Sequence, residues 1–317
     1  MHKHSRLAAA LGCLATLAMV GCATNAGIAP LTGASQQAQS SVPAGPGWIE
    51  KDGVLYHTPH IMVTRQMASQ ARIKPAITLQ YFGGPVLVSP KVYLVFWGYK
   101  TYGDPDKVAK LMKSYIKHSG GSSHNNIYVQ YYETSGGSTI YITNPSTQLG
   151  GAWFDQTNAV PSNPSDAQVA AEALQGVAHF GFDAGGSYVV MTPHGHSSPG
   201  FGTQWCAYHS NAYSGGKLVS YTNMPYAPDA GGNCGANIIA PPSDETGTDE
   251  GVTIVEGHEE GESVTDPNPG TGWYNGQYGE IGDICAWQNI QNDPFGTKSY
   301  TMQPMFSNAS QSCVQSY

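Results

Sequence analysis

The chain has 317 residues, among them 14 Lys or Arg and 22 Asp or Glu, and its formal net charge at pH 7 is -8. A chain this acidic lacks the basic surface of a nucleic-acid-binding protein, so we expect no nucleic-acid partner. Its 39 glycines, 21 prolines and 19 tyrosines indicate a loop-rich, aromatic domain of the kind found in secreted proteins.

The first residues predict export. A basic start, MHKHSR, precedes an apolar core of about fifteen residues and a small-residue end, which is typical of a signal peptide and too short for a membrane span. Met19 to Cys22, MVGC, approximates a bacterial lipobox. We therefore expect a signal peptide over 1–21, acylation of Cys22, and an outer-membrane or cell-surface lipoprotein whose lipid anchor is its membrane contact. Plain secretion is the alternative.

Composition divides the rest of the chain into three parts. Residues 22–47 contain almost no large apolar side chain and predict a flexible tether, because such a segment cannot offset the entropy of ordering. Residues 48–74 hold apolar and aromatic residues without a clear period, which fits either an arm packed on the domain or a pro-segment. Residues 75–317 are long enough for one domain with a sizeable core.

Within 75–317 the patterns predict alternating strands and helices. Expected strands cover 91–99, 126–133, 139–144 and 187–192, and expected helices cover 104–118, 165–180 and 248–265. A long Gly- and Pro-rich excursion separates the last strand from the last helix. This order resembles that of zincin-type proteins, so we expect a single α/β (α+β) domain in which a twisted mixed sheet packs on helices.

Four cysteines follow the signal, an even number that predicts two disulfides in an oxidising compartment. Three pairings are possible. We favour Cys206 with Cys234 and Cys285 with Cys313, because each pair closes a loop of about thirty residues.

The segment from Val252 to Trp287 concentrates potential metal ligands and proton carriers in a chain that is poor in charge. On the predicted helix His258 and Glu262 are one turn apart on one face, as in the HExxH helix of metalloproteases with glutamate in place of the second histidine. We expect His258 and Glu262 to bind a metal ion and Glu259 to act as the general base.

Glu280 is the expected third ligand, because its distance from Glu262 is close to that of the third ligand in thermolysin-like enzymes. Asp266 and Asp283 are competitors, and so are His194 and His196, an HxH pair that directly follows a predicted core strand. The expected cofactor is Zn²⁺. Ca²⁺ or another divalent cation is the alternative, since two carboxylates make a hard ligand set.

Two further groups of residues have competing interpretations. His209 is more typical of a packed structural histidine beside Cys206 than of a ligand. Several aromatic side chains fit core packing better than stacking on sugar rings: Trp153, Phe154, Trp205, Trp273 and Tyr274.

Several segments in order carry a family resemblance: YFGGPVLVSPKVYLVFWG, SYVVMTPHG, FGTQWCAYHS and TDEGVTIVEGHEEGESVTDP. Together they resemble the phosphate-induced, EXORDIUM-like family of secreted proteins over about 80–283. The resemblance implies that Cys206 and His209 match the family's Cys and His segment. It also implies that Val264 to Pro267 matches the Thr-Asn-Pro turn, with Asp266 in place of the Asn of plant members. The plant members are growth-related cell-wall proteins without a settled activity.

These observations predict an exported zinc-dependent metallohydrolase, a peptidase, whose partner is a peptide or protein substrate. The alternative is a non-catalytic cell-envelope protein that binds cell-wall polysaccharide and holds a structural metal ion.

Overall fold

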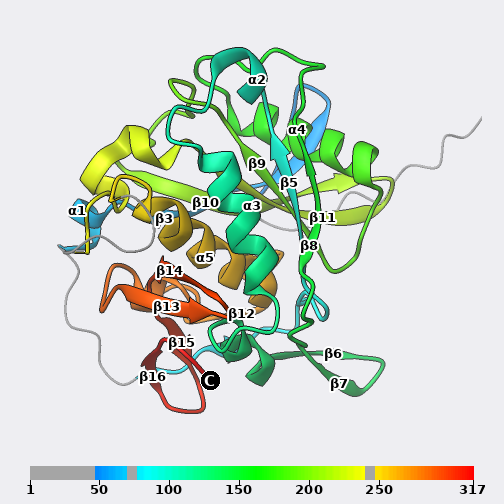
Figure 1. Ribbon diagram of the computed structural model, residues 1–317. Helices are drawn as coiled ribbons and strands as arrows, with labels where there is room; N and C mark the ends of the chain where they lie inside the picture. Colours follow the sequence, from blue (N-terminus) through cyan, green and yellow to red (C-terminus); the bar gives the residue numbers. More distant parts are fainter. Residues whose placement is uncertain (1–46, 70–76, 240–246) are drawn as a thin grey trace, which may run out of the picture. The chain divides into compact units, whose positions relative to one another are not determined.

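A mixed sheet of eight strands forms the centre of the structure (Figure 1). The computed structural model describes residues 47–69, 77–239 and 247–317. The strand order is β1-β2-β10-β11-β9-β5-β8, and β3 also pairs with β10. β8, β5, β9 and β11 are parallel, whereas β10 is antiparallel to β11, β2 and β3. The bounds are β1 Trp48–Lys51, β2 Val54–His57, β3 His60–Val63, β5 Lys91–Phe96, β8 Leu149–Trp153, β9 Gly186–Met191, β10 Trp205–Ser214 and β11 Lys217–Met224.

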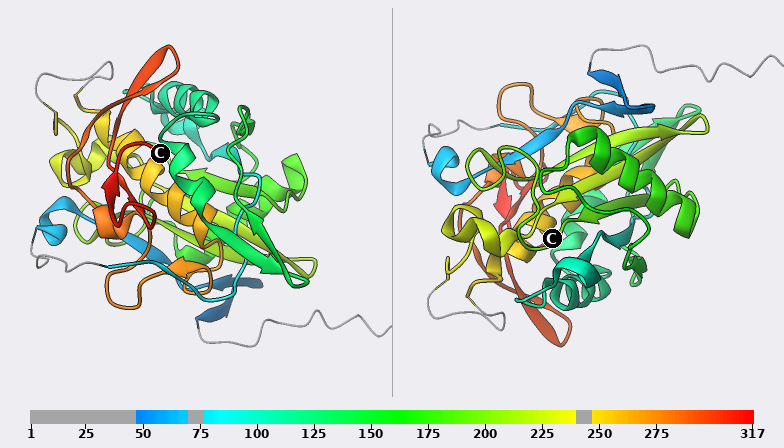
Figure 2. Two further views of the ribbon diagram at one scale, coloured as in Figure 1. Left: turned by 90° about the horizontal axis from the view of Figure 1, so that it is seen from below. Right: turned by 90° about the horizontal axis from the view of Figure 1, so that it is seen from above.

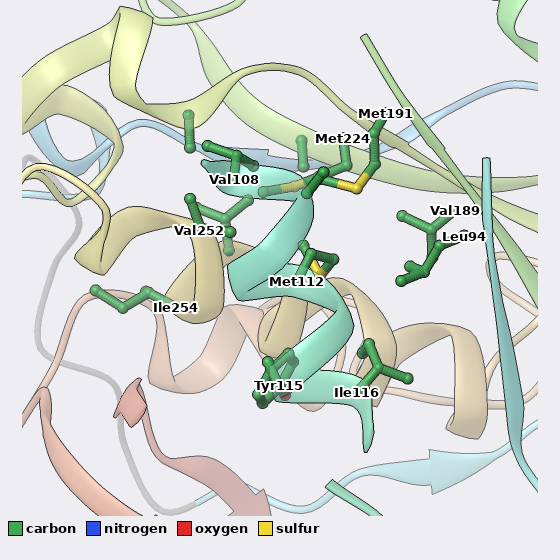
Figure 3. Packing of buried hydrophobic residues seen from close by; sticks show 14 of the residues in the cluster. Leu94, Val108, Met112, Tyr115, Ile116, Val189, Met191, Met224, Val252 and Ile254 are labelled. Carbon is green, nitrogen blue, oxygen red and sulfur yellow. The ribbon is translucent and has the colours of Figure 1, made fainter. Parts of the chain in front are cut away.

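Helices cover the two faces of this sheet, because the side chains of a strand point alternately to opposite faces. On one face α4, Asp166–Phe180, packs its alanines and valines against Tyr188 and Val190. On the other face α3, Val108–Ser119, and α5, Glu250–Thr265, share a cluster with the sheet. Figure 3 shows this second cluster from close by, and Figure 2 shows both layers from two sides.

The smaller elements surround these layers. Short helices are α1 Arg65–Ala68, α2 Tyr99–Tyr102, η1 Asn125–Gln130, η2 Ala227–Cys234 and η3 Asp283–Cys285. Hairpins or paired strands are β4 Gln80–Tyr81 with β12 Trp273–Tyr274, β6 Tyr132–Ser135 with β7 Ser138–Tyr141, β13 Gln291–Phe295 with β14 Lys298–Met302, and β15 Met305–Ser307 with β16 Ser312–Val314. In the part of the chain that the structure describes, no helix is long and apolar enough to cross a membrane.

α5 is buried on every side, which is unusual for a helix with five glutamates. Its glycines allow this close packing. A Cβ atom at Gly251 would lie 1.9 Å from the carbonyl oxygen of Cys234, and one at Gly257 would lie 2.4 Å from the Cε of Met302. These glycines lower the intrinsic helix propensity of α5, but they allow it to pack closely against η2 and β14.

The predicted mixed α/β class and both disulfides are confirmed: Cys206 is bonded to Cys234 and Cys285 to Cys313. The predicted helix over 165–180 is also confirmed, with a capping box between Ser165 and Gln168. The expected helix over 104–118 begins only at Val108, because the carboxylate of Asp104 accepts the N–H groups of Val108 and Ala109. The strands expected at 91–99 and 187–192 are β5 and β9, and the helix expected at 248–265 is α5.

Two predictions about elements were wrong. The strand expected over 126–133 is mostly the 3-10 helix η1, since the hydroxyl of Ser122 accepts the N–H of Asn125 and starts a local turn. The stretch described as a long Gly- and Pro-rich excursion, for which no strand was predicted, contains β10 and β11. Their buried polar residues, such as Ser210 and Asn211, hide the pattern of a core strand. The strand expected over 139–144 is the short β7.

The described part of the segment predicted as an arm or pro-segment contributes strands to the sheet. β2 and β3 both pair with β10, and β1 pairs with β2. The predicted signal, tether and lipidated Cys22 lie outside the described residues.

Candidate functional site

α5 carries the first part of a buried cluster of acids and histidines. His258, Glu259 and Glu262 lie in the middle of this helix and are inaccessible to solvent. The four-residue spacing brings His258 Nε2 to 3.0 Å from Glu262 Oε1, as the sequence predicts for residues on one helix face.

The sheet supplies two histidines from strands far apart in sequence. His209 of β10 and His60 of β3 are direct partners in the antiparallel pairing, and their ring centroids are 5.4 Å apart. The side chain of His209 points to the α5 face, where its Nδ1 lies 3.3 Å from Glu262 Oε2 and 3.4 Å from Glu259 Oε2. β10 therefore places an imidazole between the carboxylates of α5.

The segment after β12 closes the cluster with two more acids. Glu280 Oε2 lies 3.5 Å from His209 Nε2, and Glu280 Oε1 lies 3.5 Å from His60 Nδ1. His60 Nε2 is hydrogen-bonded to Asp283 Oδ2 at 2.7 Å. Backbone N–H groups of this segment hold two carboxylates of the cluster: that of Asp283 donates to Glu262 Oε1, and that of Glu280 donates to Asp283 Oδ2.

His209 lacks ordinary partners. Both of its ring nitrogens are buried and make no hydrogen bond, and the same is true of both carboxylate oxygens of Glu259 and of Glu280. Buried polar atoms are almost always satisfied, and an unpaired buried carboxylate is costly. In the described part of the chain, no lysine or arginine forms an ion pair with Glu259, Glu262 or Glu280. A cation among these atoms would satisfy them together.

His258 has a different environment from His209. The amide nitrogen of Gln303 contacts both the carbonyl oxygen of Gly282, at 3.0 Å, and His258 Nδ1, at 3.1 Å. These two contacts of one amide group fix the orientation of the His258 ring. Nε2 makes no hydrogen bond, but it faces Glu262 Oε1 and Asp283 Oδ1. This contact suits a residue that orients the acids.

The electrostatics separate the three histidines. Burial lowers the pKa of His209 in spite of the opposing effect of Glu262, which keeps the ring neutral and able to bind a metal. Burial would also lower the pKa of His60, but Asp283 raises it to about 9. For His258 burial again acts downward, and the carboxylate of Glu262 raises the pKa above its ordinary value.

The pKa values of the three buried acids also differ from one another. Burial, followed by the charge of Glu262, raises the pKa of Glu259 well above its usual range. Burial and then Asp266 raise the pKa of Glu280. Burial would raise the pKa of Glu262 too, but His258 and His209 hold it well below its usual range. Without a cation Glu262 is therefore the acid that stays ionised, whereas Glu259 and Glu280 favour the protonated form. A metal ion bound to Glu280 would displace its proton.

Two sets of residues have ligand atoms close enough to share a metal ion. One set is His209, Glu262 and Glu280, and the other is His60, Glu262 and Asp283. In each set the donor atoms lie within 4.8 Å of one another. One imidazole with two carboxylates suits zinc, manganese or iron, whereas calcium prefers an all-oxygen shell.

A pocket of about 1060 Å³ adjoins the cluster on the side of His60 and Asp283. These two side chains are 30% and 18% exposed, while the other cluster members are buried. Apolar side chains, including Ile61, Val63 and Trp287, line the pocket together with Arg65. Solvent or a ligand would therefore reach the cluster past His60 and Asp283.

The remaining predicted site residues belong to neither set, although, after burial, the charge of Asp266 raises the pKa of Glu280. The carboxylate of Asp266 accepts the backbone N–H groups of Gly270, Thr271 and Gly272 and so closes the turn after α5. His194 Nδ1 pairs with Asp229, and the ring of His196 packs on Tyr102.

The aromatic side chains considered for sugar stacking mostly pack against other rings. Trp205 and Trp273 are buried. Trp153 stacks on His179, Phe154 on Phe96 and Tyr274 on Phe82.

His60 carries no motif in the sequence, and the sequence favours a structural role for His209, so neither is predicted there as a ligand. One feature of the sequence could have indicated the position of His209. It stands two residues after Ala207, so in a strand with alternating faces both side chains point to the α5 face. No such feature exists for His60, because only the pairing of β3 with β10 brings it to the cluster.

No protein-family model, curated protein or solved structure matches this chain. The resemblance to the EXORDIUM-like family and to zincins therefore stays a prediction.

Proposed function

We propose that the chain is an exported metal-dependent hydrolase that cleaves peptide bonds. One observation carries this proposal: His209, Glu262 and Glu280 are buried, and their potential metal-ligand atoms lie close together. Most of these atoms have no hydrogen-bond partner. The two disulfides agree with an oxidising, extracytoplasmic location.

In this proposal His209, Glu262 and Glu280 hold a divalent cation, with zinc as the first candidate. A cation bound there supplies Lewis-acid chemistry, by polarising a carbonyl and lowering the pKa of a bound water. His258 orients Glu262 through its Nε2, and Gln303 fixes the ring of His258. These contacts fix the orientation of the Glu262 carboxylate, and a metal ligand needs a fixed orientation.

Glu259 is the proposed proton acceptor. Its carboxylate is buried beside His209, and neither oxygen is engaged in a hydrogen bond. Burial raises its pKa well above the usual range, and a cation held by the neighbouring donors would favour the ionised carboxylate, which can take a proton from water and pass it to the leaving amine. The pocket beside His60, which apolar and polar side chains line together, would receive the substrate's side chains.

One observation favours a second candidate, a cell-envelope protein that binds polysaccharide or another partner without catalysis. His209, Glu259 and Glu262 have no exposed surface, and full burial is typical of a structural metal site. In that case the cation would stabilise the packing of α5 on β10.

Metal analysis followed by a peptide-substrate screen separates the two candidates. The hydrolase is expected to hold a transition metal and to cleave peptides in a chelator-sensitive way. A protein that holds its metal, cleaves no peptide in a broad library and loses thermal stability on chelation would be the structural candidate instead. A protein without bound metal after purification, and without affinity for added zinc or manganese, would contradict both.

A further inference from the structure

We propose that the cluster binds two divalent cations, with Glu262 as the carboxylate shared between an inner site and an outer site. The inner site is His209, Glu262 and Glu280, and it belongs to the proposed function on which this inference rests. The outer site is His60, Glu262 and Asp283, and it opens on the pocket.

The first argument is the arrangement of the donors. Glu262 belongs to both sets of residues that can share a metal ion. Glu280 also lies between the two sites, because one of its oxygens is 3.5 Å from His209 Nε2 and the other is 3.5 Å from His60 Nδ1. Both oxygens of Glu280 are buried without a hydrogen bond. Carboxylates between two imidazoles are well placed to bridge two cations.

The second argument is the charge. Glu259, Glu262, Glu280 and Asp283 carry four formal negative charges when they are ionised, and three of these acids are essentially inaccessible to solvent. One divalent cation offsets half of that charge. Two offset the charge of these four acids and so lower the cost of burying them side by side. The fifth nearby acid, Asp266, has its carboxylate held by three backbone N–H groups.

The two sites differ in what a cation must displace. The inner donors of His209 and Glu280 make no hydrogen bond, so a cation enters without breaking one. The outer cation has to replace the hydrogen bond of 2.7 Å between His60 and Asp283. The inner site therefore fills first, and the outer site binds more weakly and exchanges through the pocket.

A substrate that enters through the pocket would reach an outer cation before it reaches the inner cation. In two-metal hydrolases one cation generates the nucleophile and the other orients the reacting group. The inner site, next to Glu259, suits the first task, and the outer site suits the second.

The test is metal stoichiometry on the full chain. The protein is stripped with a chelator, titrated with Zn²⁺, desalted and analysed for bound metal per chain. The wild type is expected to bind two equivalents in two steps. His60→Ala and Asp283→Asn are each expected to bind one, and His209→Ala is expected to lose the tighter step.

His194→Ala is the matched control, because His194 forms a similar pair with Asp229 outside the cluster. It should bind two equivalents, as the wild type does. Circular dichroism and the retained inner equivalent report whether the His60 variant is folded, and Asp283→Asn gives an independent result if it is not.

The outcomes separate this inference from the proposed function. A wild type with one equivalent, or a His60→Ala variant that still binds two, overturns the second site and leaves the first intact. No bound metal at all overturns the proposed function. Titration with Mn²⁺ gives a second readout, since two Mn²⁺ ions that share Glu262 should show coupled electron paramagnetic resonance signals that vanish in His60→Ala.

Discussion

His60 and His209 stand opposite each other on β3 and β10, with ring centroids 5.4 Å apart. Residues that are direct cross-strand partners have neighbouring side chains on one face of the sheet. This pairing sets an imidazole at the mouth of the acidic cluster and another at its buried end, 149 positions further along the chain.

Replacement of His209 should remove the inner cation. We expect His209→Ala to lose most of its tightly bound metal, because Glu262 and Glu280 then lack their imidazole partner. His124→Ala is the control, since His124 is another buried histidine that contacts an acid, Asp293, away from the cluster. Metal analysis of both purified variants checks this, and equal loss in the two would point to general misfolding.

The neighbouring glutamates of α5 should separate binding from proton transfer. Glu259→Gln is expected to keep its metal and to lose about 10²- to 10⁴-fold in hydrolysis rate, the usual contribution of a general base. Glu262→Gln should lose metal as well as rate. Glu260→Gln is the control, because Glu260 lies on the same helix and contacts Asn125 and Tyr115 instead. Full activity of Glu259→Gln would refute its assignment as the base.

The His258 variant tests whether this residue binds or orients. His258→Ala is expected to weaken metal affinity less than His209→Ala, since its Nδ1 already contacts the amide of Gln303 and its Nε2 faces Glu262. Competition with a chromogenic zinc chelator measures the two affinities. A larger loss of affinity in His258→Ala would indicate that His258 is itself a metal ligand, as the sequence pattern predicts.

A buried acid far from the cluster should make stability depend on pH. Burial, with a contribution from Asp155, raises the pKa of Glu172 in α4 to about 9. A carboxyl whose pKa rises on folding stabilises the fold below its unfolded value, about 4.5, and loses that contribution as the pH increases toward 9. Glu172→Gln should therefore gain stability over the wild type with rising pH, by at most about 1.4 kcal/mol per pH unit. Thermal unfolding from pH 5 to 9 tests this, with Glu50→Gln on the exposed β1 as control. A difference that does not change with pH would contradict it.

The disulfide near η3 should contribute to stability and to the outer site. The double variant Cys285→Ser with Cys313→Ser is expected to lose about 2–4 kcal/mol, because the unfolded chain is no longer constrained. It should also weaken the second metal step, since Cys285 adjoins Asp283 in η3. Denaturant unfolding and metal titration measure the two effects. Loss of stability without any change in the second step would show that the bond does not support the outer site.

The sequence determined a good part of this protein. The helix that follows Ser165 and the helix that carries His258, Glu259 and Glu262 follow from local patterns, and the cysteine spacing favours the disulfide pairing that is observed. These are features in which the interacting residues are close in the chain or constrained by a simple count. Helix periodicity alone brings His258 to Glu262.

Only the tertiary structure decided which other side chains meet this helix. His60 and His209 come from separate strands, and their meeting depends on the pairing of β3 with β10. Glu280 and Asp283, which the sequence offered as candidate ligands, lie in one segment after β12, and the fold decides that they face these histidines. The polar residues within β10 also masked a core strand, because a buried hydrogen-bonded Asn211 looks in sequence like a loop residue. Long-range pairing of this kind is fixed by packing over the whole domain, and no short stretch of sequence encodes it.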